Sequence, residues 1–524
     1  MAALPDYLTA AKPVPQDARA AWYKNTAQTY AGIMLWFVFW QDVVSGSATP
    51  GGSLAASLGV ALLSLLAAAL FCHFLTYLVP GLLGMKTGLP LYVVGTSTYG
   101  VRGGFIMPGF LMGALQFGWL AVNAFFSCWA ICKCFNIGLN QAGDVIVPGL
   151  VHGSMTVVFI LLAVFVGLMG IQYVARVATF MPLIPLAILI LLLVKTAGGI
   201  GNFDAEKLVE TNKAALQADA TAKAETAKVA EAKVADATTE EEKTDAQTEA
   251  DKAAEAAEAA EVMAGKEPLG ALAIFLFMST YVVGFFATAG AAGADFGMNN
   301  RNASDVQLGG LTGIVGATFF AGGVAILVVA GAYGTEGLVT PEMQLQLNPV
   351  KLMEVIVPDM ANVLFLLLAI AAFAPACFPA FIAANSFRTT MPNFGMVAVA
   401  IGTLASIALA VTGLAGQAVA VFKVVGASFG PICGAMMADY LLSGRKWAGP
   451  RAAFNPAGWI SWAVGFVLGA IDLVADNVPG LAGIKIGVPC PPMAALIAGF
   501  VLYLILAKAG LESQKLEMPA TAEE

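Results

Sequence analysis

The stretch LAASLGVALLSLLAAALFCHFLTYLVP, residues 54–80, contains no Asp, Glu, Lys or Arg. An apolar run of about 18 residues or more can cross the hydrocarbon core of a bilayer as a helix. In lipid, the backbone satisfies its hydrogen bonds only as a helix or as a closed barrel. This run is too long and too evenly apolar for a barrel strand, so it predicts a transmembrane helix.

Eleven further runs of the same kind occur along the chain. Together they predict twelve spans, at residues 27–46, 54–80, 104–132, 150–171, 178–197, 268–292, 308–333, 361–386, 395–413, 418–442, 457–477 and 491–508. The chain has 524 residues, of which 59% are hydrophobic and 11% charged, whereas a soluble domain has about 25% charged residues. The composition excludes an ordinary globular enzyme. The predicted fold class is an all-α polytopic membrane protein with twelve transmembrane helices.

The arginines indicate how the spans are oriented. If the N-terminus is cytoplasmic, the positive-inside rule is obeyed by all seven: Arg19, Arg102, Arg176, Arg301, Arg388, Arg445 and Arg451. An even number of spans returns the C-terminus to the same side. We therefore predict an integral protein of the plasma (inner) membrane, with cytoplasmic tails at residues 1–26 and 511–524.

Residues 201–267 form a low-complexity insert rich in Ala, Glu and Lys. From Asp204 to Glu267 there are 8 Lys and 17 acidic residues, a net charge of −9 against −8 for the whole chain. The rest of the chain is nearly neutral, so no nucleic-acid partner is indicated. Ala, Glu and Lys favour helices. The insert therefore predicts one or two exposed helices outside the cytoplasm, either a solvated spacer or a docking arm for an external partner.

The insert also divides the spans into two equal sets. Five spans lie in residues 27–200, five lie in residues 268–442, and two accessory spans lie in residues 443–510. Two successive repeats that each have an odd number of spans are inserted in opposite orientations. Two sets of five spans therefore predict a five-plus-five inverted-repeat (LeuT-like) transporter. Such folds bind their substrate near the middle of the membrane, where the first helix of each repeat is broken.

Both first helices have features of a broken helix. Span 1 contains TYAGIMLWFVFWQDVVSGSATPGG (29–52), in which Gln41 and Asp42 interrupt an apolar run. Span 6 contains STYVVGFFATAGAAGADF (279–296), in which Gly284 precedes Phe285 and Phe286. Glycine also serves simple close packing of membrane helices. An acid within a span is a functional candidate, so Asp42 either binds a cation or proton, or accepts hydrogen bonds from backbone N–H groups at a break.

Span 3 contains GALQFGWLAVNAFFS (113–127). Trp119 and Asn123 are four residues apart and so share one face of the helix. A flat, polar ring is bound by aromatic faces that stack on it and by an amide that offers both a donor and an acceptor. The alternative is a core Trp beside an Asn that bonds across helices.

Span 8 contains LAIAAFAPACFPAFIAANSFR (368–388). Pro375 and Pro379 each remove a backbone donor, which leaves carbonyl groups of the preceding turn free. These carbonyls could coordinate a small cation, or the prolines could simply kink the helix. Cys377 lies between the two prolines, and we assign it with Asp42 to ion coupling.

The sequence resembles the nucleobase:cation symporter-1 family of cytosine, purine, allantoin and hydantoin permeases. The motifs that carry the resemblance are NTAQTYAGIMLWFVFWQD (25–42), LPLYVVGTSTYGVRGGFIMPG (89–109), GWLAVNAF (118–125), GFFATAGAAGADF (284–296) and SFGPICGAMMADYLL (428–442). The resemblance implies a five-plus-five inverted repeat with two additional helices. It also implies a small planar heterocycle as substrate and a cation as the coupling ion.

The resemblance further implies roles for single residues. Trp119 matches a family Trp that stacks on the ring, Asn123 matches the amide that reads it, and Phe286 replaces a second stacking Trp. In span 8, relatives have Thr or Ser and Asn for sodium and substrate, whereas this chain has PACFP at 375–379. Because those hydroxyl ligands are missing, proton coupling through Asp42 competes with sodium coupling.

We therefore expect a secondary active transporter that imports a nucleobase or a related planar nitrogen heterocycle by cation symport. Trp119 with Phe286 or Phe285 would hold the ring, and Asn123 would read its edge. Gln41 and the backbone near Gly284 would complete the polar contacts. The cation would be sodium or a proton, and no resident cofactor or catalytic residue is expected. Alternatives are a transporter of a vitamin or nucleoside, and a transporter-like receptor without net transport.

Overall fold

The computed structural model describes residues 4–27, 49–141, 143–169, 173, 181, 183–236, 239–340, 343, 349–391, 393–478 and 480–518. Within this part of the chain, ten helices are long and apolar enough to cross a membrane. A shorter apolar helix, Gly395–Val411, coincides with the predicted ninth span. The predicted first span, 27–46, lies almost wholly outside the described residues. The described chain is thus an all-α membrane protein, as predicted.

The helix predicted as span 2 packs against those predicted as spans 6 and 7. Span 2 consists of α4 (Leu58–Phe71), η5 (Cys72–Tyr77) and α5 (Leu78–Thr87). Span 6 is α14 (Ala271–Ala291), and the short helix α15 (Gly293–Gly297) follows it outside the span. Span 7 consists of α16 (Ala303–Gly310), η8 (Leu311–Gly316) and α17 (Ala317–Gly334). Both η5 and η8 are π-helical turns inserted into otherwise regular helices. A Cβ atom on Gly290 of α14 would lie 2.5 Å from Thr76 Cβ of η5, so the close approach of spans 2 and 6 requires glycine.

A second group consists of the helices predicted as spans 3, 4, 8 and 9. Its elements are η6 (Phe105–Phe110), α8 (Leu111–Phe135), α9 (Leu150–Met169), α19 (Ala361–Ala371), α20 (Phe373–Thr390) and α21 (Gly395–Val411). Span 8 is therefore two helices, α19 and α20, that meet at Ala372. A Cβ atom on Gly167 of α9 would lie 2.8 Å from the Ala380 side chain of α20, so these two helices also pack through a glycine.

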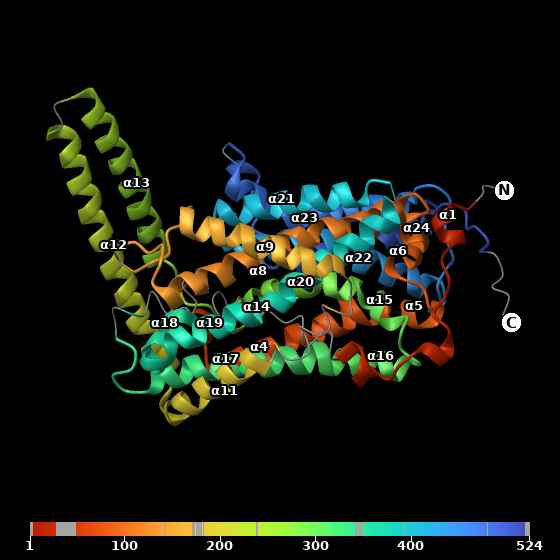
Figure 1. Ribbon diagram of the computed structural model, residues 1–524, viewed down its shortest axis with the longest axis horizontal. Coiled ribbons are helices and arrows are strands. Elements are labelled where there is room, and N and C mark those ends of the chain that lie inside the picture. Colours follow the sequence, from red (N-terminus) through yellow and green to blue (C-terminus); the bar gives the residue numbers. More distant parts are fainter. Residues whose placement is uncertain are drawn as a thin grey trace.

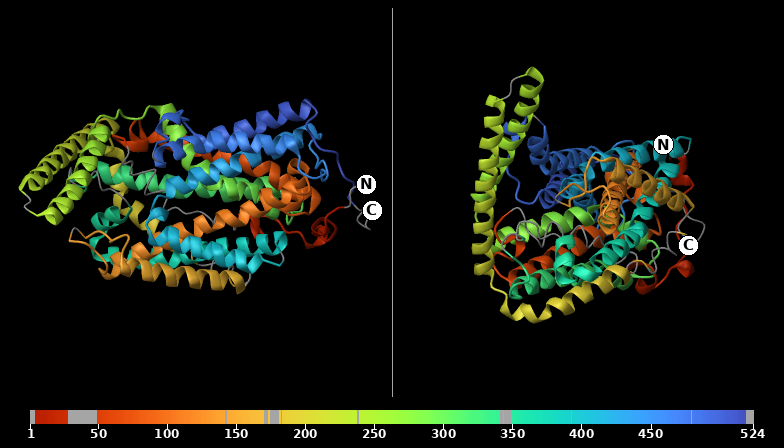
Figure 2. Two further views of the ribbon diagram at one scale, coloured as in Figure 1. Left: turned by 90° about the horizontal axis from the view of Figure 1, so that it is seen from above. Right: turned by 60° about the vertical axis from the view of Figure 1, so that its left-hand side comes forward.

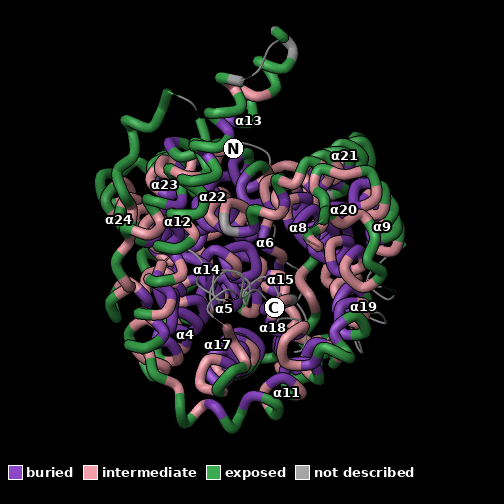
Figure 3. Tube along the Cα trace, turned by 90° about the vertical axis from the view of Figure 1, so that its left-hand side faces the viewer, coloured by how far each residue is buried: buried purple, intermediate pink, exposed green. Residues whose placement is uncertain are grey.

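The remaining helices surround these two groups. They are α11 (Leu183–Thr196) with η7 (Ala197–Asn202), the short α18 (Pro349–Ile356), and α22 (Ala418–Leu442), α23 (Pro456–Asn477) and α24 (Pro491–Lys508). Helix α22 packs against α14 on one side and against α23 and α24 on the other. Buried segments gather on the inward faces of the helices, and exposed segments lie outside (Figure 3). On α9 the outer face carries Val158, Leu161, Leu162 and Phe165, each more than half exposed, which is the surface that lipid covers.

The insert forms a hairpin of two helices, α12 (Ala205–Asp236) and α13 (Glu240–Ala264), which projects from the helical body (Figures 1 and 2). A capping box begins α13: Thr239 Oγ1 accepts from the Glu242 backbone N–H, and the Glu242 carboxylate accepts from that of Thr239. Small alanines form the contact between the two helices, among them Ala227, Ala230, Ala250 and Ala260. The expected exposed helices are therefore present as an antiparallel pair.

Both termini lie at one end of the molecule, and the hairpin projects from the other (Figure 1). We call the first of these the terminal end. The N-terminal segment is bound there, because the Arg19 guanidinium donates to the Met85 carbonyl at 2.6 Å and Gln16 donates to the Arg301 carbonyl at 2.8 Å. This arrangement agrees with the predicted even number of crossings.

Candidate functional site

A cavity of about 620 Å³, open solvent included, lies between α8, the α14–α15 segment and α20. It is thus bordered by helices of both groups. Its walls are formed by Met112, Gln116, Trp119, Asn123, Phe285, Thr288, Ala289, Ala292, Phe296, Pro375, Phe378, Pro379 and Ile382. None of these described residues is charged, so the walls suit a neutral ligand.

One face of α8 supplies a full wall of the cavity. Met112, Gln116, Trp119 and Asn123 follow one another at intervals of three or four residues, which places them on a single helical stripe. Each is at most 7% exposed. The sequence predicted the pairing of Trp119 with Asn123 and missed Gln116, although its spacing from Trp119 is also helical.

Asn123 presents an unused acceptor to this cavity. Its Nδ2 atom donates to the Trp119 backbone carbonyl at 2.8 Å. Its Oδ1 atom is buried and has no hydrogen-bond partner among the described residues. An unsatisfied buried acceptor costs about 1–3 kcal/mol, so this oxygen is placed to accept from a ligand N–H.

The aromatic side chains at the cavity touch one another. The Trp119 and Phe285 rings are 4.9 Å apart between centroids and nearly perpendicular, at 77°. The Phe422 ring of α22 lies 5.1 Å from Trp119 on a tilted plane. A ring sandwiched between Trp119 and Phe285 would need centroids about 7 Å apart, twice the contact distance of carbon atoms. The two side chains must therefore separate before they can hold a ring between them.

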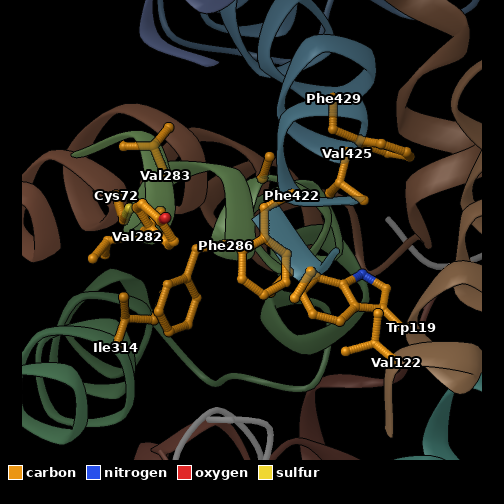
Figure 4. Packing of buried hydrophobic residues seen from close by; sticks show 14 of the residues in the cluster. Cys72, Trp119, Val122, Val282, Val283, Phe286, Ile314, Phe422, Val425 and Phe429 are labelled. Atoms are coloured by element: carbon orange, nitrogen blue, oxygen red, sulfur yellow. The ribbon is translucent and has the colours of Figure 1, made fainter. Parts of the chain in front are cut away.

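Phe286 does not line the cavity. Its side chain is 1% exposed and lies towards Ile314 of span 7, away from Trp119 (Figure 4). Adjacent residues on a helix point about 100° apart, so Phe285 faces the cavity and Phe286 the core of spans 2, 6 and 7. The family resemblance implied that Phe286 replaces a second Trp that stacks on the substrate ring, whereas in this structure Phe285 is the residue that lines the cavity.

Gly284 and Cys377 are also absent from the cavity walls. A Cβ atom on Gly284 would lie 2.8 Å from the Phe422 carbonyl oxygen, so this glycine serves the packing of α14 on α22. Cys377 is buried, and its carbonyl oxygen lies 2.8 Å from the position of a Cβ atom on Gly167. Its backbone thus packs against α9. Gln41 and Asp42 lie outside the described residues.

The break in span 8 borders the cavity. Pro375 and Pro379 of α20 are both wall residues. Because proline has no N–H, the carbonyls four residues earlier, of Ala371 and Pro375, have no donor from the regular helical pattern. Thr288, another wall residue that the sequence did not predict, adds a hydroxyl to the amides of Gln116 and Asn123.

The cavity extends from the middle of α8 towards the terminal end. Asn123 lies halfway along α8 and Met112 in its first turn. The preceding turn carries Phe105, whose ring lies 5.9 Å from that of Tyr7 in the N-terminal segment. Ile382 of α20 is on the same side, because Ser386, one turn later, donates to the Gly109 carbonyl.

Comparison with known proteins identifies the fold. No protein-family model and no curated protein matches the chain. Among solved structures, the inward-facing conformation of Mhp1 matches with a TM-score of 0.56 and 14% identity, over 96% of this chain and 97% of that one. Mhp1, a nucleobase-cation-symport-1 family transporter, matches in a closed conformation with bromovinylhydantoin bound with a TM-score of 0.57 and 14% identity, over 97% and 95% of the two chains.

A Na+-coupled sialic acid symporter in a substrate-bound outward-open state also matches, with a TM-score of 0.50 and 12% identity over 98% of this chain and 93% of that one. Nearly the whole chain is thus similar in fold to cation-coupled membrane transporters. The resemblance drawn from sequence motifs and the similarity of fold lead to the same group of proteins.

Proposed function

We propose that this chain is a secondary active transporter that imports a nucleobase or a related planar nitrogen heterocycle by cation symport and alternating access. The observation that carries the proposal is a neutral cavity midway along the helices, where Trp119 lies beside the unpaired Oδ1 of Asn123. This cavity occurs in a chain with the fold of membrane symporters. A fold alone does not determine function, so the argument depends on the site.

A planar heterocycle suits the residues of this cavity. Stacking of such a ring on an aromatic face contributes about 1–3 kcal/mol. A ring N–H would donate to Asn123 Oδ1, and Gln116 and Thr288 lie on the walls to serve other polar atoms. The second face of the ring would meet Phe285 after its ring turns away from Trp119. Gln41 would complete the polar contacts from the undescribed first span.

The coupling cation would be sodium or a proton. For sodium, support comes from the break in span 8, where Ala371 and Pro375 have carbonyls without a regular helical donor. Hard cations such as sodium prefer oxygen ligands of this kind. A proton would instead require a titratable side chain, for which Asp42 is the candidate from the sequence.

We further propose the full arrangement of twelve spans in two inverted repeats, 27–200 and 268–442. Helices five spans apart pack against each other: span 2 against span 7, span 3 against span 8 and span 4 against span 9. Spans 2 and 7 each contain a π-helical turn, at Cys72–Tyr77 and Leu311–Gly316. A pseudo-two-fold axis in the membrane plane would produce both regularities.

A thermal-shift screen tests the substrate class. Purified protein is heated with cytosine, hypoxanthine, allantoin or 5-benzylhydantoin, each in sodium chloride and in choline chloride. We expect one class of heterocycle to raise the melting temperature, and a sodium requirement would identify the cation. The Asn123→Leu variant should bind that ligand about tenfold more weakly, because one hydrogen bond of about 1.4 kcal/mol is lost.

The matched control is Ser127→Ala, one turn further along α8. Ser127 is buried and donates to the Asn123 carbonyl at 2.6 Å, but it is not a wall residue. Its loss should leave ligand affinity unchanged. If none of the four heterocycles stabilises the protein in either salt, the proposed substrate class is wrong. Counterflow of labelled ligand in proteoliposomes then separates a transporter from a receptor, since a receptor exchanges no label.

A further inference from the structure

The stripe of α8 that lines the cavity has an aromatic ring between two amides. Trp119 lies three residues after Gln116 and four residues before Asn123, and all three are wall residues. Residues three or four positions apart are neighbours on one face of a helix. A planar ligand that stacks on Trp119 therefore has an amide beyond each of two opposite edges.

The spacing of the two amides suits a single ring. Gln116 and Asn123 are seven residues apart, which is about 10.5 Å along the axis of α8. A hydrogen bond at each end takes up about 2.9 Å, which leaves about 4–5 Å between the two polar atoms of a ligand that joins the amides. Polar atoms on opposite edges of one six-membered ring are separated by a similar distance.

The amide of Gln116 is almost unused within the described part of the chain. Its side chain is 6% exposed, and its one hydrogen bond to a described residue runs from Nε2 to the Met112 sulfur at 3.5 Å. A thioether sulfur is only a weak acceptor, whereas an amide has two N–H donors and a carbonyl acceptor. Gln116 can therefore both donate to a ligand and accept from it.

Thr288 lies at the same depth as Gln116 on the facing wall. Helices α8 and α14 run in opposite directions, because α8 begins near the terminal end and α14 begins near the hairpin (Figure 1). The rings of Trp119 and Phe285 are 4.9 Å apart between centroids and mark one level of the cavity. Gln116 lies three residues from Trp119 and Thr288 three residues from Phe285, so each is about 4.5 Å closer to the terminal end.

The hydroxyl of Thr288 also has unused bonding capacity. A threonine in an apolar helix can donate to the carbonyl four residues earlier, and on the same helix Thr280 donates to the Leu276 carbonyl at 2.9 Å. Thr288 is 5% exposed and makes no such bond to Gly284 or to any other residue that the structure describes. A hydroxyl removed from water without a partner is unfavourable, so a polar ligand atom beside it would be stabilised.

We propose that Gln116 and Thr288 are specificity-determining residues that bind a polar group on the second edge of the substrate ring, opposite the N–H that Asn123 accepts. This inference rests on the proposed function and narrows its substrate class to heterocycles with hydrogen-bonding groups on two opposite edges. The described wall residues farther towards the terminal end, Met112, Ala292 and Phe296, are all apolar. Gln116 and Thr288 are therefore the polar side chains that a second edge would meet.

Matched pairs of ligands test the second edge. Each pair keeps a ring N–H for Asn123 and differs by one polar group elsewhere on the ring: cytosine and 2-pyrimidinone, hypoxanthine and purine, allantoin and hydantoin, or 5-benzylhydantoin and 4-benzylimidazolidin-2-one. Isothermal titration calorimetry of the purified protein gives both dissociation constants for each pair whose first member stabilises it. We expect the first member to bind about tenfold or more tightly than the second, because one hydrogen bond is lost.

Substitutions then assign this selectivity to residues. Gln116→Leu should reduce the ratio of the two dissociation constants to about threefold or less, and Thr288→Val should lower it in the same direction. Asn123→Leu should weaken both members equally and keep the ratio, and a merely structural role of Gln116 would do the same. The matched control is Thr280→Val on α14, which is not a wall residue and should keep both affinities.

A ratio that stays at the parent value in both Gln116→Leu and Thr288→Val overturns the inference. So does a parent protein that binds both members of a pair equally. If Gln116→Leu does not fold, Thr288→Val decides. If no first member of any pair binds the parent protein, the proposed function is wrong and the inference falls with it, so the two failures are distinguishable.

Discussion

Arg451 is a charged residue that is 1% exposed. Its guanidinium donates to Asp439 at 2.9 Å and to Glu512 at 2.6 Å. Asp439 also accepts from the Ser97 hydroxyl at 2.6 Å. The network joins the link between spans 2 and 3, the end of α22 and the C-terminal segment. The two motifs that contain Ser97 and Asp439 therefore have a structural role at the terminal end.

Replacing Arg451 by Met should strongly destabilise the fold. The substitution leaves the Asp439 carboxylate buried without its cation, and breaking such a pair costs about 3–5 kcal/mol. The measurement is the thermal unfolding midpoint in detergent. The control is Arg445→Met on the same loop, where the side chain is exposed and the midpoint should stay within error. Equal midpoints for both variants would contradict a stabilising network.

Asp295 in α15 should make stability depend on pH. The residue is half-buried and accepts from the Leu91 backbone N–H at 2.9 Å. Burial raises its pKa to about 6 from 3.8, partly offset by the bond from Leu91. A raised pKa in the folded state means that the stabilising contribution is complete below about pH 4 and is lost as the pH rises through about 6.

The Asp295→Asn variant should remove this dependence and keep the acceptor for Leu91. Relative to the parent protein, the variant should gain about 1 kcal/mol between about pH 4 and about pH 7, once solvent screening of a partly exposed group is allowed for. Unfolding midpoints across this range give the difference curve. A flat difference curve would show that Asp295 is not the cause.

At the scale of helices, the periodicity of apolar residues in the sequence correctly predicted those features that depend on a single helix. The existence of the apolar helices and the shared face of Trp119 and Asn123 follow from a repeat of 3.6 residues per turn. Which of Phe285 and Phe286 faces the cavity depends instead on the rotation of α14. That rotation is fixed by the contact of Gly284 with the Phe422 backbone, a tertiary contact between residues distant in sequence. The sequence around Gly284 does not reveal this contact. The packing of the Cys377 backbone against Gly167 is likewise a contact between residues distant in sequence.

A buried asparagine near the start of α12, Asn212, attaches the hairpin α12–α13 to the helical body. Asn212 is 7% exposed, and its Oδ1 accepts from the Gly51 backbone N–H at 3.1 Å, just after the predicted first span. Its side chain also bonds to that of Tyr333 near the end of span 7. Asn212 therefore joins the base of the hairpin to Gly51 and to the end of span 7, whereas the rest of the hairpin projects from the body (Figure 1).

Replacing Asn212 by Leu should lower the free energy of unfolding by about 1–3 kcal/mol, because the Gly51 N–H and the Tyr333 hydroxyl lose a buried partner. Replacing residues 219–252 by a short Gly-Ser turn should leave both stability and ligand binding unchanged, since that part is solvated helix. Thermal unfolding with and without ligand measures both. A large loss of ligand binding on removal of the tip would instead favour a functional arm.

At the scale of the whole molecule, the arrangement of the ends makes the orientation testable. The termini and the hairpin lie at opposite ends of the helical body (Figure 1), so they must lie on opposite sides of a membrane that the helices cross. The arginine distribution predicts cytoplasmic termini. Lys228 on α12 and Asp17 in the N-terminal segment are both exposed and serve as reporters.

In intact cells, a membrane-impermeant maleimide should label Lys228→Cys and should label Asp17→Cys only after permeabilisation, both in a Cys134→Ser background, because the other six cysteines are buried. The physical reason is the positive-inside bias of short loops, which sets the orientation during insertion. The reverse pattern would mean that the topology predicted from the arginines is inverted. Labelling of both positions in intact cells would mean that the two ends do not face opposite compartments, and the proposed odd number of five spans before the hairpin would be wrong.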